Sequence, residues 1–251
     1  MIIITSPSKT YNPKPSEVTL TLPLFQKETD RLLGAMLRNK TKLETVLGVS
    51  QDVAKLNRDR IENWADAATT PAAWSYRGET FFGLSIEDLS NEDIEYAQEH
   101  LYIVSGLYGL LRPTDGIKPY RLEMSTKLKS GTASNLYQFW DDTLSETIMN
   151  SDPKFVINCA SKEYSKAALK DINIPIITPT FLHNGKSKMA FAKYSRGLMA
   201  RWAIENRITD SKQLKQFSVE GYEYNQALST DNKLVFVAPK GFSIKGRFTT
   251  L

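Results

Sequence analysis

Basic side chains gather on a stretch of the chain that proline and glycine constrain. The segment GLLRPTDGIKPYRLEM, residues 109–124, contains Arg112, Lys118 and Arg121. Cations on such a loop either pin it to nearby groups or face an anionic partner. We expect Arg112 and Arg121 to face an anionic cleft. The alternative is that Arg121 and Glu123 pair with neighbours and hold the loop in place.

A glycine between two predicted helices forms the sharpest local pattern. In LETVLGVSQDVAKLN, residues 43–57, an apolar helix end meets Gly48, and a second helix soon begins. Gly48 permits a backbone turn that other residues resist. The second helix begins with free N–H groups and a positive dipole end, which bind phosphate oxygens without reading bases. The sequence therefore predicts DNA contacts from Gly48, Val49, Ser50, Lys55 and Arg58.

This pattern is close to the hairpin of helix-hairpin-helix DNA-binding modules. Two positions depart from it, since Leu47 stands where Pro is usual and Ser50 where the second Gly is usual. A plain helical hairpin with glycine at its turn is common, and it stays open as the alternative interpretation.

Basic residues also share one side of a predicted long helix, AKYSRGLMARWAIENR. At about 100° per residue, Lys193, Arg196 and Arg207 fall together, opposite an apolar side. Gly197 lies near this basic side, and its lack of a side chain leaves room for a close approach to the backbone. The alternative is a solvated basic face over a packed apolar one.

Hydroxyl and lysine side chains follow the ends of two predicted strands. SPSKT, residues 6–10, comes after the first strand, and ASKEY, residues 160–164, comes after a later one. Such α/β folds collect ligand contacts just beyond the carboxyl ends of their strands. Neither stretch has the glycine spacing of a phosphate loop. The candidates for an anion-binding cleft from these stretches are Ser6, Lys9, Thr10, Ser161 and Tyr164.

The sequence contains few patterns that are typical of catalytic or metal-binding sites. The two histidines, His100 and His183, lack metal-ligand spacing, and no G-x-S-x-G elbow occurs. We therefore predict no catalytic residue, no metal site and no cofactor.

The elements that must position these residues indicate an α/β protein. We expect strands at 2–4, 154–160 and 174–181, and a closing hairpin between GYEYN and KLVFV. Expected helices cover 24–38, 41–47, 51–67, 136–149, 164–170 and about 192–208. Alternating strands and helices favour one α/β domain over residues 1–251, with a mixed β-sheet and surrounding helices. The helix-hairpin-helix-like region at about 38–68 is expected to be an insertion on that domain.

Composition and charge are those of a globular, slightly basic protein. The 251 residues are 41% hydrophobic and 24% charged, which is ordinary for a globular protein, and the net charge is +4. Six bases against three acids lie between Arg38 and Arg60, and the tail is basic through Lys240, Lys245 and Arg247. Neither a membrane span nor a signal peptide is visible, and the single Cys159 fits a reducing compartment. We expect a cytoplasmic protein without a membrane partner.

Motifs spread along nearly the whole chain resemble the YaaA peroxide-stress proteins of bacteria. They are SPSKT, SGLYGLLRP, PYRLEM, LYQFW, INCASKEY, RGLMARW, IENR and EGY. The resemblance implies a DNA-binding α/β protein that helps cells survive hydrogen peroxide by lowering unincorporated iron and limiting oxidative DNA damage. Cys159 stands where Leu can occur, which argues against peroxide reduction by a thiol. Cleft candidates within or next to the matching stretches are Lys9, Arg112, Tyr120, Arg121, Lys193 and Arg196.

Two functions from different classes therefore stay open. The first is a DNA-binding protein for double-stranded or branched DNA. The second is an enzyme that acts on a small phosphorylated or carboxylated substrate in the same cleft.

Overall fold

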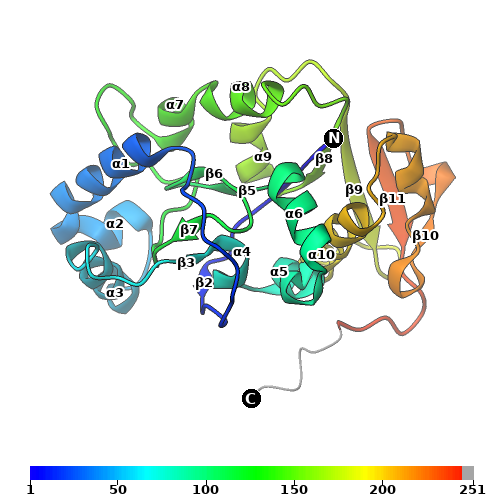
Figure 1. The fold of residues 1–251 in the computed structure, drawn as a ribbon, viewed down its shortest axis with the longest axis horizontal. Coiled ribbons are helices and arrows are strands. Elements are labelled where there is room, and N and C mark those ends of the chain that lie inside the picture. The colour runs from blue at the N-terminus through cyan, green and yellow to red at the C-terminus, as the bar shows by residue number, and fades with distance from the viewer. Residues whose placement is uncertain (245–251) are drawn as a thin grey trace.

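A seven-stranded mixed sheet forms the centre of the computed structural model, which describes residues 1–244 (Figure 1). The predicted basic residues Lys245 and Arg247 lie outside this range. The strand order is β10-β11-β9-β8-β1-β5-β6, with β5, β1, β8, β9 and β11 parallel and the edge strands β6 and β10 antiparallel. The bounds are β1 Ile2–Thr5, β5 Leu101–Ser105, β6 Gly109–Leu111, β8 Val156–Cys159, β9 Ile176–Leu182, β10 Glu223–Tyr224 and β11 Lys233–Val237.

The central strands are apolar along their length because both faces of the sheet are covered. Every residue of β1 and of β8 is buried, as expected for parallel strands packed on both faces. Ile3 lies opposite Leu101 of β5 on one side and Ile157 of β8 on the other. The predicted α/β class with a mixed sheet is confirmed, and so is the closing hairpin of β10 with β11.

Helices surround the sheet, and short strand pairs form separate two-stranded sheets beside it. In Figure 1, α1, α2 and α3 lie together at one end of the molecule, and β10 and β11 lie at the other. The helices are α1 Gln26–Arg38, α2 Leu43–Leu47, α3 Gln51–Glu62, α4 Ala72–Ser75, α5 Glu79–Leu84, α6 Asn91–His100, α7 Leu136–Trp140, α8 Thr143–Met149, α9 Lys162–Ala168 and α10 Met189–Glu205. β2 Thr10–Tyr11 pairs with β4 Tyr76–Arg77, and β3 Thr70–Pro71 pairs with β7 Gly116–Ile117. Short 3-10 segments cover Lys40–Lys42, Ile86–Asp88, Ser211–Gln216, Val219–Gly221 and Gln226–Leu228.

Two glycines bring α5 and α10 into backbone contact. A Cβ added to Gly83 would lie 2.1 Å from the carbonyl oxygen of Tyr194, and one added to Gly197 would lie 2.0 Å from that of Thr80. The close approach expected at Gly197 is therefore an approach by a neighbouring helix.

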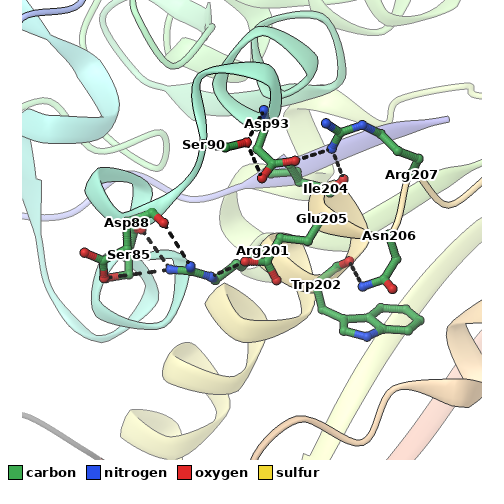
Figure 2. Close-up of polar contacts among 10 residues, drawn as sticks. All are labelled: Ser85, Asp88, Ser90, Asp93, Arg201, Trp202, Ile204, Glu205, Asn206 and Arg207. Carbon is green, nitrogen blue, oxygen red and sulfur yellow. Dashed lines mark hydrogen bonds and ion pairs between the residues drawn. The ribbon is translucent and has the colours of Figure 1, made fainter.

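Arginines at the end of α10 fasten it to the segment between α5 and α6 and to the first turn of α6 (Figure 2). The Arg201 guanidinium donates to the carbonyl oxygens of Ser85 and Asp88 and pairs with Glu205 at 2.8 Å. Arg207 Nη1 lies 2.6 Å from a carboxylate oxygen of Asp93. Arg207 thus serves as a helix clamp, whereas the sequence pattern grouped it with Lys193 and Arg196.

One expected helix is interrupted. The structure divides the stretch 136–149 into α7 and α8 at Asp141, whose φ of 41° is incompatible with a continuous helix.

The start of α6 has a side-chain cap. Ser90 accepts a hydrogen bond from the Asp93 amide, and the acidic residues of the first turn, Glu92 and Asp93, suit the positive end of the helix dipole. Among the described residues, no helix combines the length and apolar character that a membrane span requires.

Candidate functional site: a cleft at the strand ends and a turn between helices

A cleft of about 740 Å³ opens at the carboxyl ends of β1 and β8. From β1 the chain adds β5 on one side of the sheet and later returns to add β8 on the other. Such a reversal of strand order is where open α/β sheets bind ligands. The lining residues are Ser6, Pro7, Ser8, Lys9, Thr10, Gly78, Glu79, Thr80, Phe81, Glu123, Cys159, Ser161, Glu163, Tyr164, Ser187, Met189, Ala192, Lys193 and Arg196.

Two serines join the strand ends at the floor of the cleft. The Ser161 amide donates to Ser6 Oγ at 2.8 Å, and Ser6 Oγ donates to Ser161 Oγ at 3.3 Å. Because β1 and β8 are adjacent and parallel, the residues that follow them meet at one edge of the sheet. The sequence prediction that these two stretches share a site agrees with this placement.

Glu123 joins two of the predicted cations. Lys9 Nζ lies 2.7 Å from one carboxylate oxygen of Glu123, and Arg121 Nη2 lies 2.9 Å from the other. Partial burial opposes ionisation of Glu123, but hydrogen bonds and charge from Lys9 and Arg121 hold its pKa below the ordinary value. Arg121 therefore reaches the cleft through Glu123 and does not line it.

Lys193 and Arg196 bring positive charge to the part of the cleft that α10 lines. They lie three residues apart near the start of α10, so they share one face of the helix. Neither has a carboxylate partner among the described residues, and Arg196 Nε is buried without a hydrogen-bond partner there. A buried guanidinium nitrogen without a partner is unfavourable, so this corner of the cleft is suited to an anion.

The thiol of Cys159 borders the cleft but is poorly suited to nucleophilic chemistry. Cys159 is 2% exposed, and its burial raises the pKa of the thiol to about 12, although the charge of Arg196 opposes the shift. Burial also raises the pKa of Tyr164 well above that of a free tyrosine. Both groups are therefore protonated near neutral pH.

Two cleft candidates lie elsewhere in the structure. Arg112 donates to Asp115 through both Nε and Nη2, and to the carbonyl oxygen of Leu22. Tyr120 is 9% exposed, and its hydroxyl lies 2.7 Å from the Tyr76 hydroxyl. Neither side chain lines the cleft, and both hold neighbouring segments together.

Structural contacts thus account for the cations of the constrained loop. Lys118 Nζ donates to the carbonyl oxygens of Trp64 and Ala65 at 2.6 and 3.0 Å. Together with the pairs Arg112–Asp115 and Arg121–Glu123, these contacts pin residues 112–123 to the body of the protein. The alternative interpretation of the loop, in which Arg121 and Glu123 pair, describes the observed contacts.

The turn between α2 and α3 is exposed and has the expected glycine geometry. Gly48 adopts the left-handed conformation, with φ 61°, and its added Cβ would meet nothing within 4 Å. The amides of Gly48 and Val49 both donate to the Glu44 carbonyl oxygen. The first hydrogen bond of α3 runs from Ala54 to Ser50, so the amides of residues 51–53 have no partner within the helix. No side-chain cap covers them.

Side chains beside the turn differ in availability. Lys55 is exposed and has no carboxylate partner among residues 1–244. Arg58 Nε donates to the carbonyl oxygen of Lys40 at 2.9 Å, so it also holds α3 to the 3-10 segment Lys40–Lys42. The geometry is that of two helices joined by a tight turn, and a helix-hairpin-helix function of this unit stays a prediction.

Sequence reasoning missed the wall that α5 supplies. Gly78, with φ 142°, precedes α5, and Thr80 and Phe81 of this helix line the cleft. Glu163 at the start of α9 lines it too, and one of its oxygens accepts a hydrogen bond from the Ser125 amide at 3.0 Å. A glycine within each helix, Gly83 in α5 and Gly197 in α10, is the sequence signal that could have predicted this contact. Helices that lie this close require glycine where their backbones meet.

Comparison with known proteins agrees with the resemblance carried by the sequence motifs. Residues 1–228 match a family described as peroxide stress protein YaaA. The chain belongs to this family. A UPF0246 protein of Ruegeria pomeroyi is 41% identical over 254 residues, covering 95% of this chain and 99% of the relative. UPF0246 proteins of Roseobacter denitrificans and Ralstonia pickettii are 42% and 39% identical, covering 95% and 94% of this chain and 98% of each relative. The matched region of this YaaA-family chain includes both the cleft and the α2–α3 turn.

Proposed function

We propose that this protein binds double-stranded or branched DNA through the α2–α3 turn during the peroxide stress response. The observation that carries the proposal is the exposed start of α3, where the amides of residues 51–53 lack intrahelical partners beside the exposed Lys55. Amides at a helix start, reinforced by the positive dipole end, bind phosphate oxygens of any base sequence. On the family resemblance, the protein is also linked to lowering unincorporated iron and so to limiting oxidative DNA damage.

A series of cations supports a path for the nucleic-acid backbone from the turn toward the cleft. Burial lowers the pKa of Arg60 on α3; Tyr11 opposes the shift, and the nearby charge of Arg121 adds to it. Arg121 in turn shares Glu123 with Lys9 at the cleft. In Figure 1, β2, which contains Tyr11, lies between α3 and α5. Glu123 offsets part of the charge of Arg121 and Lys9. The path therefore supports the proposal mainly through Arg60, whose positive charge favours a polyanion over a small neutral partner.

Salt dependence tests the proposal. Labelled duplex and four-way-branched DNA are titrated at several salt concentrations with the wild type and with Lys55→Gln. The logarithm of the affinity should fall linearly with the logarithm of salt, and Lys55→Gln should reduce the steepness by roughly one counterion. Lys27→Gln, an exposed lysine change on α1, is the matched control and should alter neither quantity. Binding that is absent, or that Lys55→Gln and Lys27→Gln weaken equally, would count against the proposal.

A second candidate function is an enzyme acting on a small phosphorylated or carboxylated substrate in the cleft. The observation that favours it is the pair Lys193 and Arg196, without carboxylate partners among the described residues and placed at the reversal point of the sheet. Thermal-shift screening with a mixture of metabolites tests it. A ligand at 100 times its Kd should add about 2.7 kcal/mol to the stability, and a screen without any shift would remove this candidate.

A further inference from the structure

The two walls of the cleft differ in the chemistry they offer. On α10, Lys193 and Arg196 provide positive charge without a carboxylate partner in the part of the chain described. At the start of α9, Glu163 also lines the cleft and offers a carboxylate that one backbone amide, that of Ser125, engages. A ligand that satisfies both the cations and this carboxylate carries an anionic group and hydrogen-bond donors.

The space between these walls suits a ring. Phe81, Met189 and Ala192 give the cleft apolar surface, and Met189 is 77% exposed, so it lies open to an incoming group. The volume of about 740 Å³ lies within the range of small-molecule sites, roughly 300–1,000 Å³. A bare phosphate or a short carboxylate would leave most of this space to water.

Rigid support adds to the case for a preformed site. Figure 2 shows the Arg201 clamp on the segment after α5. Together with the glycine contact between α5 and α10, this clamp fixes the α10 part of the cleft relative to α5, which contains Phe81. At the carboxyl ends of β1 and β8, Ser6 and Ser161 hold the strand ends to each other. A site whose walls are held in this way binds without a large ordering cost.

We propose that the cleft binds one nucleotide unit, with its phosphate at Lys193 and Arg196 and the hydrogen-bond donors of its base toward Glu163. The inference rests on the second candidate function, a small anionic ligand in the cleft, and names its class. It does not depend on duplex binding at the α2–α3 turn. The unit comes either from a free nucleoside monophosphate or from an unpaired nucleotide within a DNA strand.

Calorimetric titration at fixed ionic strength tests the proposal. The probes are the nucleoside 5′-monophosphates, the matching nucleosides, orthophosphate, a hexose phosphate and a dicarboxylate. At least one monophosphate should bind roughly tenfold or more tightly than its nucleoside, because only the monophosphate brings a charged group to Lys193 and Arg196. It should also bind more tightly than orthophosphate, because only the nucleotide fills the apolar space of the cleft and reaches Glu163. Arg196→Gln should remove the advantage over the nucleoside, and Lys129→Gln, at an exposed lysine outside the cleft, should leave it unchanged. Glu163→Gln should alter the preference among bases and leave the phosphate dependence intact.

The two sources are separated by competition. A duplex with one unpaired nucleotide and the matching full duplex are tested for displacement of a bound fluorescent nucleoside monophosphate. Displacement by the unpaired nucleotide, sensitive to Arg196→Gln, assigns the site to DNA, and monophosphate binding without such displacement assigns it to a free nucleotide.

Three outcomes would overturn the inference. These are binding of neither source, equal binding of orthophosphate and nucleotide, and tighter binding of the hexose phosphate or dicarboxylate. The last of these would preserve the second candidate function. If Lys55→Gln loses duplex binding and keeps nucleotide binding, the result tests only the proposal of DNA binding at the α2–α3 turn.

Discussion

Gly83 and Gly197 hold α5 and α10 so close that the backbone of each helix occupies the space of the other's missing side chain. Because backbone cannot yield as a flexible side chain can, Gly197→Ala should lower the free energy of unfolding by about 3 kcal/mol or more. Denaturant titration measures this. Gly34→Ala on α1, where the nearest contact is the flexible end of Arg38 at 3.4 Å, is the control and should be neutral or stabilising by up to about 1 kcal/mol. Similar effects of the two changes would contradict the packing account.

Asp115 is a buried anchor for the constrained loop. It is fully buried and accepts hydrogen bonds from the Arg112 backbone, the Arg112 guanidinium and Thr21 Oγ1. Asp115→Ala leaves the Arg112 charge without its partner, so we expect a loss of about 3–5 kcal/mol in unfolding free energy. Asp231→Asn, an exposed carboxylate change, should stay within about 0.5 kcal/mol. A loss below about 1 kcal/mol for Asp115→Ala would show that Arg112 does not depend on this pairing.

Both histidines should make the protein less stable in mild acid. Burial lowers the pKa of His183, helped by the charge of Lys188, and burial lowers that of His100, although its hydrogen bond with the Met1 carbonyl opposes the shift. The unfolded chain takes up protons near pH 6.5, where the folded histidines do not. Their stabilising effect is therefore complete above that pH and is lost as pH falls toward the lowered folded values.

The variant His183→Gln isolates one of these contributions. Its side chain does not titrate, so the unfolding free energy should depend less steeply on pH between about 7 and 5. The variant should also be less stable at pH 7, because Tyr222 loses its hydrogen bond to the imidazole. Denaturant titration at several pH values provides the measurement. An unchanged dependence of the unfolding free energy on pH would show that His183 does not contribute to the loss of stability in mild acid.

Cys159 should resist oxidation in the folded protein. Its burial and raised pKa, about 12, leave almost no thiolate at neutral pH. We expect millimolar hydrogen peroxide, followed by a sulfenic-acid probe and mass spectrometry, to leave Cys159 unlabelled in the native protein. The same treatment in denaturant should label it. Labelling in the native state would reopen a thiol mechanism for the family's link to peroxide.

Local patterns predicted most of the architecture. The buried strands β1 and β8 are short apolar runs, and the sequence identifies them because strands covered on both faces must be apolar throughout. The closeness of Ser6 to Ser161 also follows from the sequence pattern, since residues beyond adjacent parallel strands meet at one sheet edge.

The remaining features depend on contacts that a linear sequence does not display. Arg112 and Arg121 have the same residue type as Arg196, yet the first two are paired by Asp115 and Glu123. Only tertiary geometry decides whether a cation meets a carboxylate, because the partner can lie anywhere in the chain. The break at Asp141 is a further example, since a residue with a positive φ of 41° lies within a stretch of good helical periodicity.

NMR of the backbone amides tests the central claim most directly, because it observes the start of α3 itself. Duplex DNA is added to the labelled protein, and the amide resonances of residues 51–53 are followed beside those of Gly34 on α1. The account predicts saturable shifts for residues 51–53, which disappear at high salt, and little change at Gly34. Shifts confined to other surfaces, with residues 51–53 unmoved at saturation, would contradict DNA binding at the α2–α3 turn.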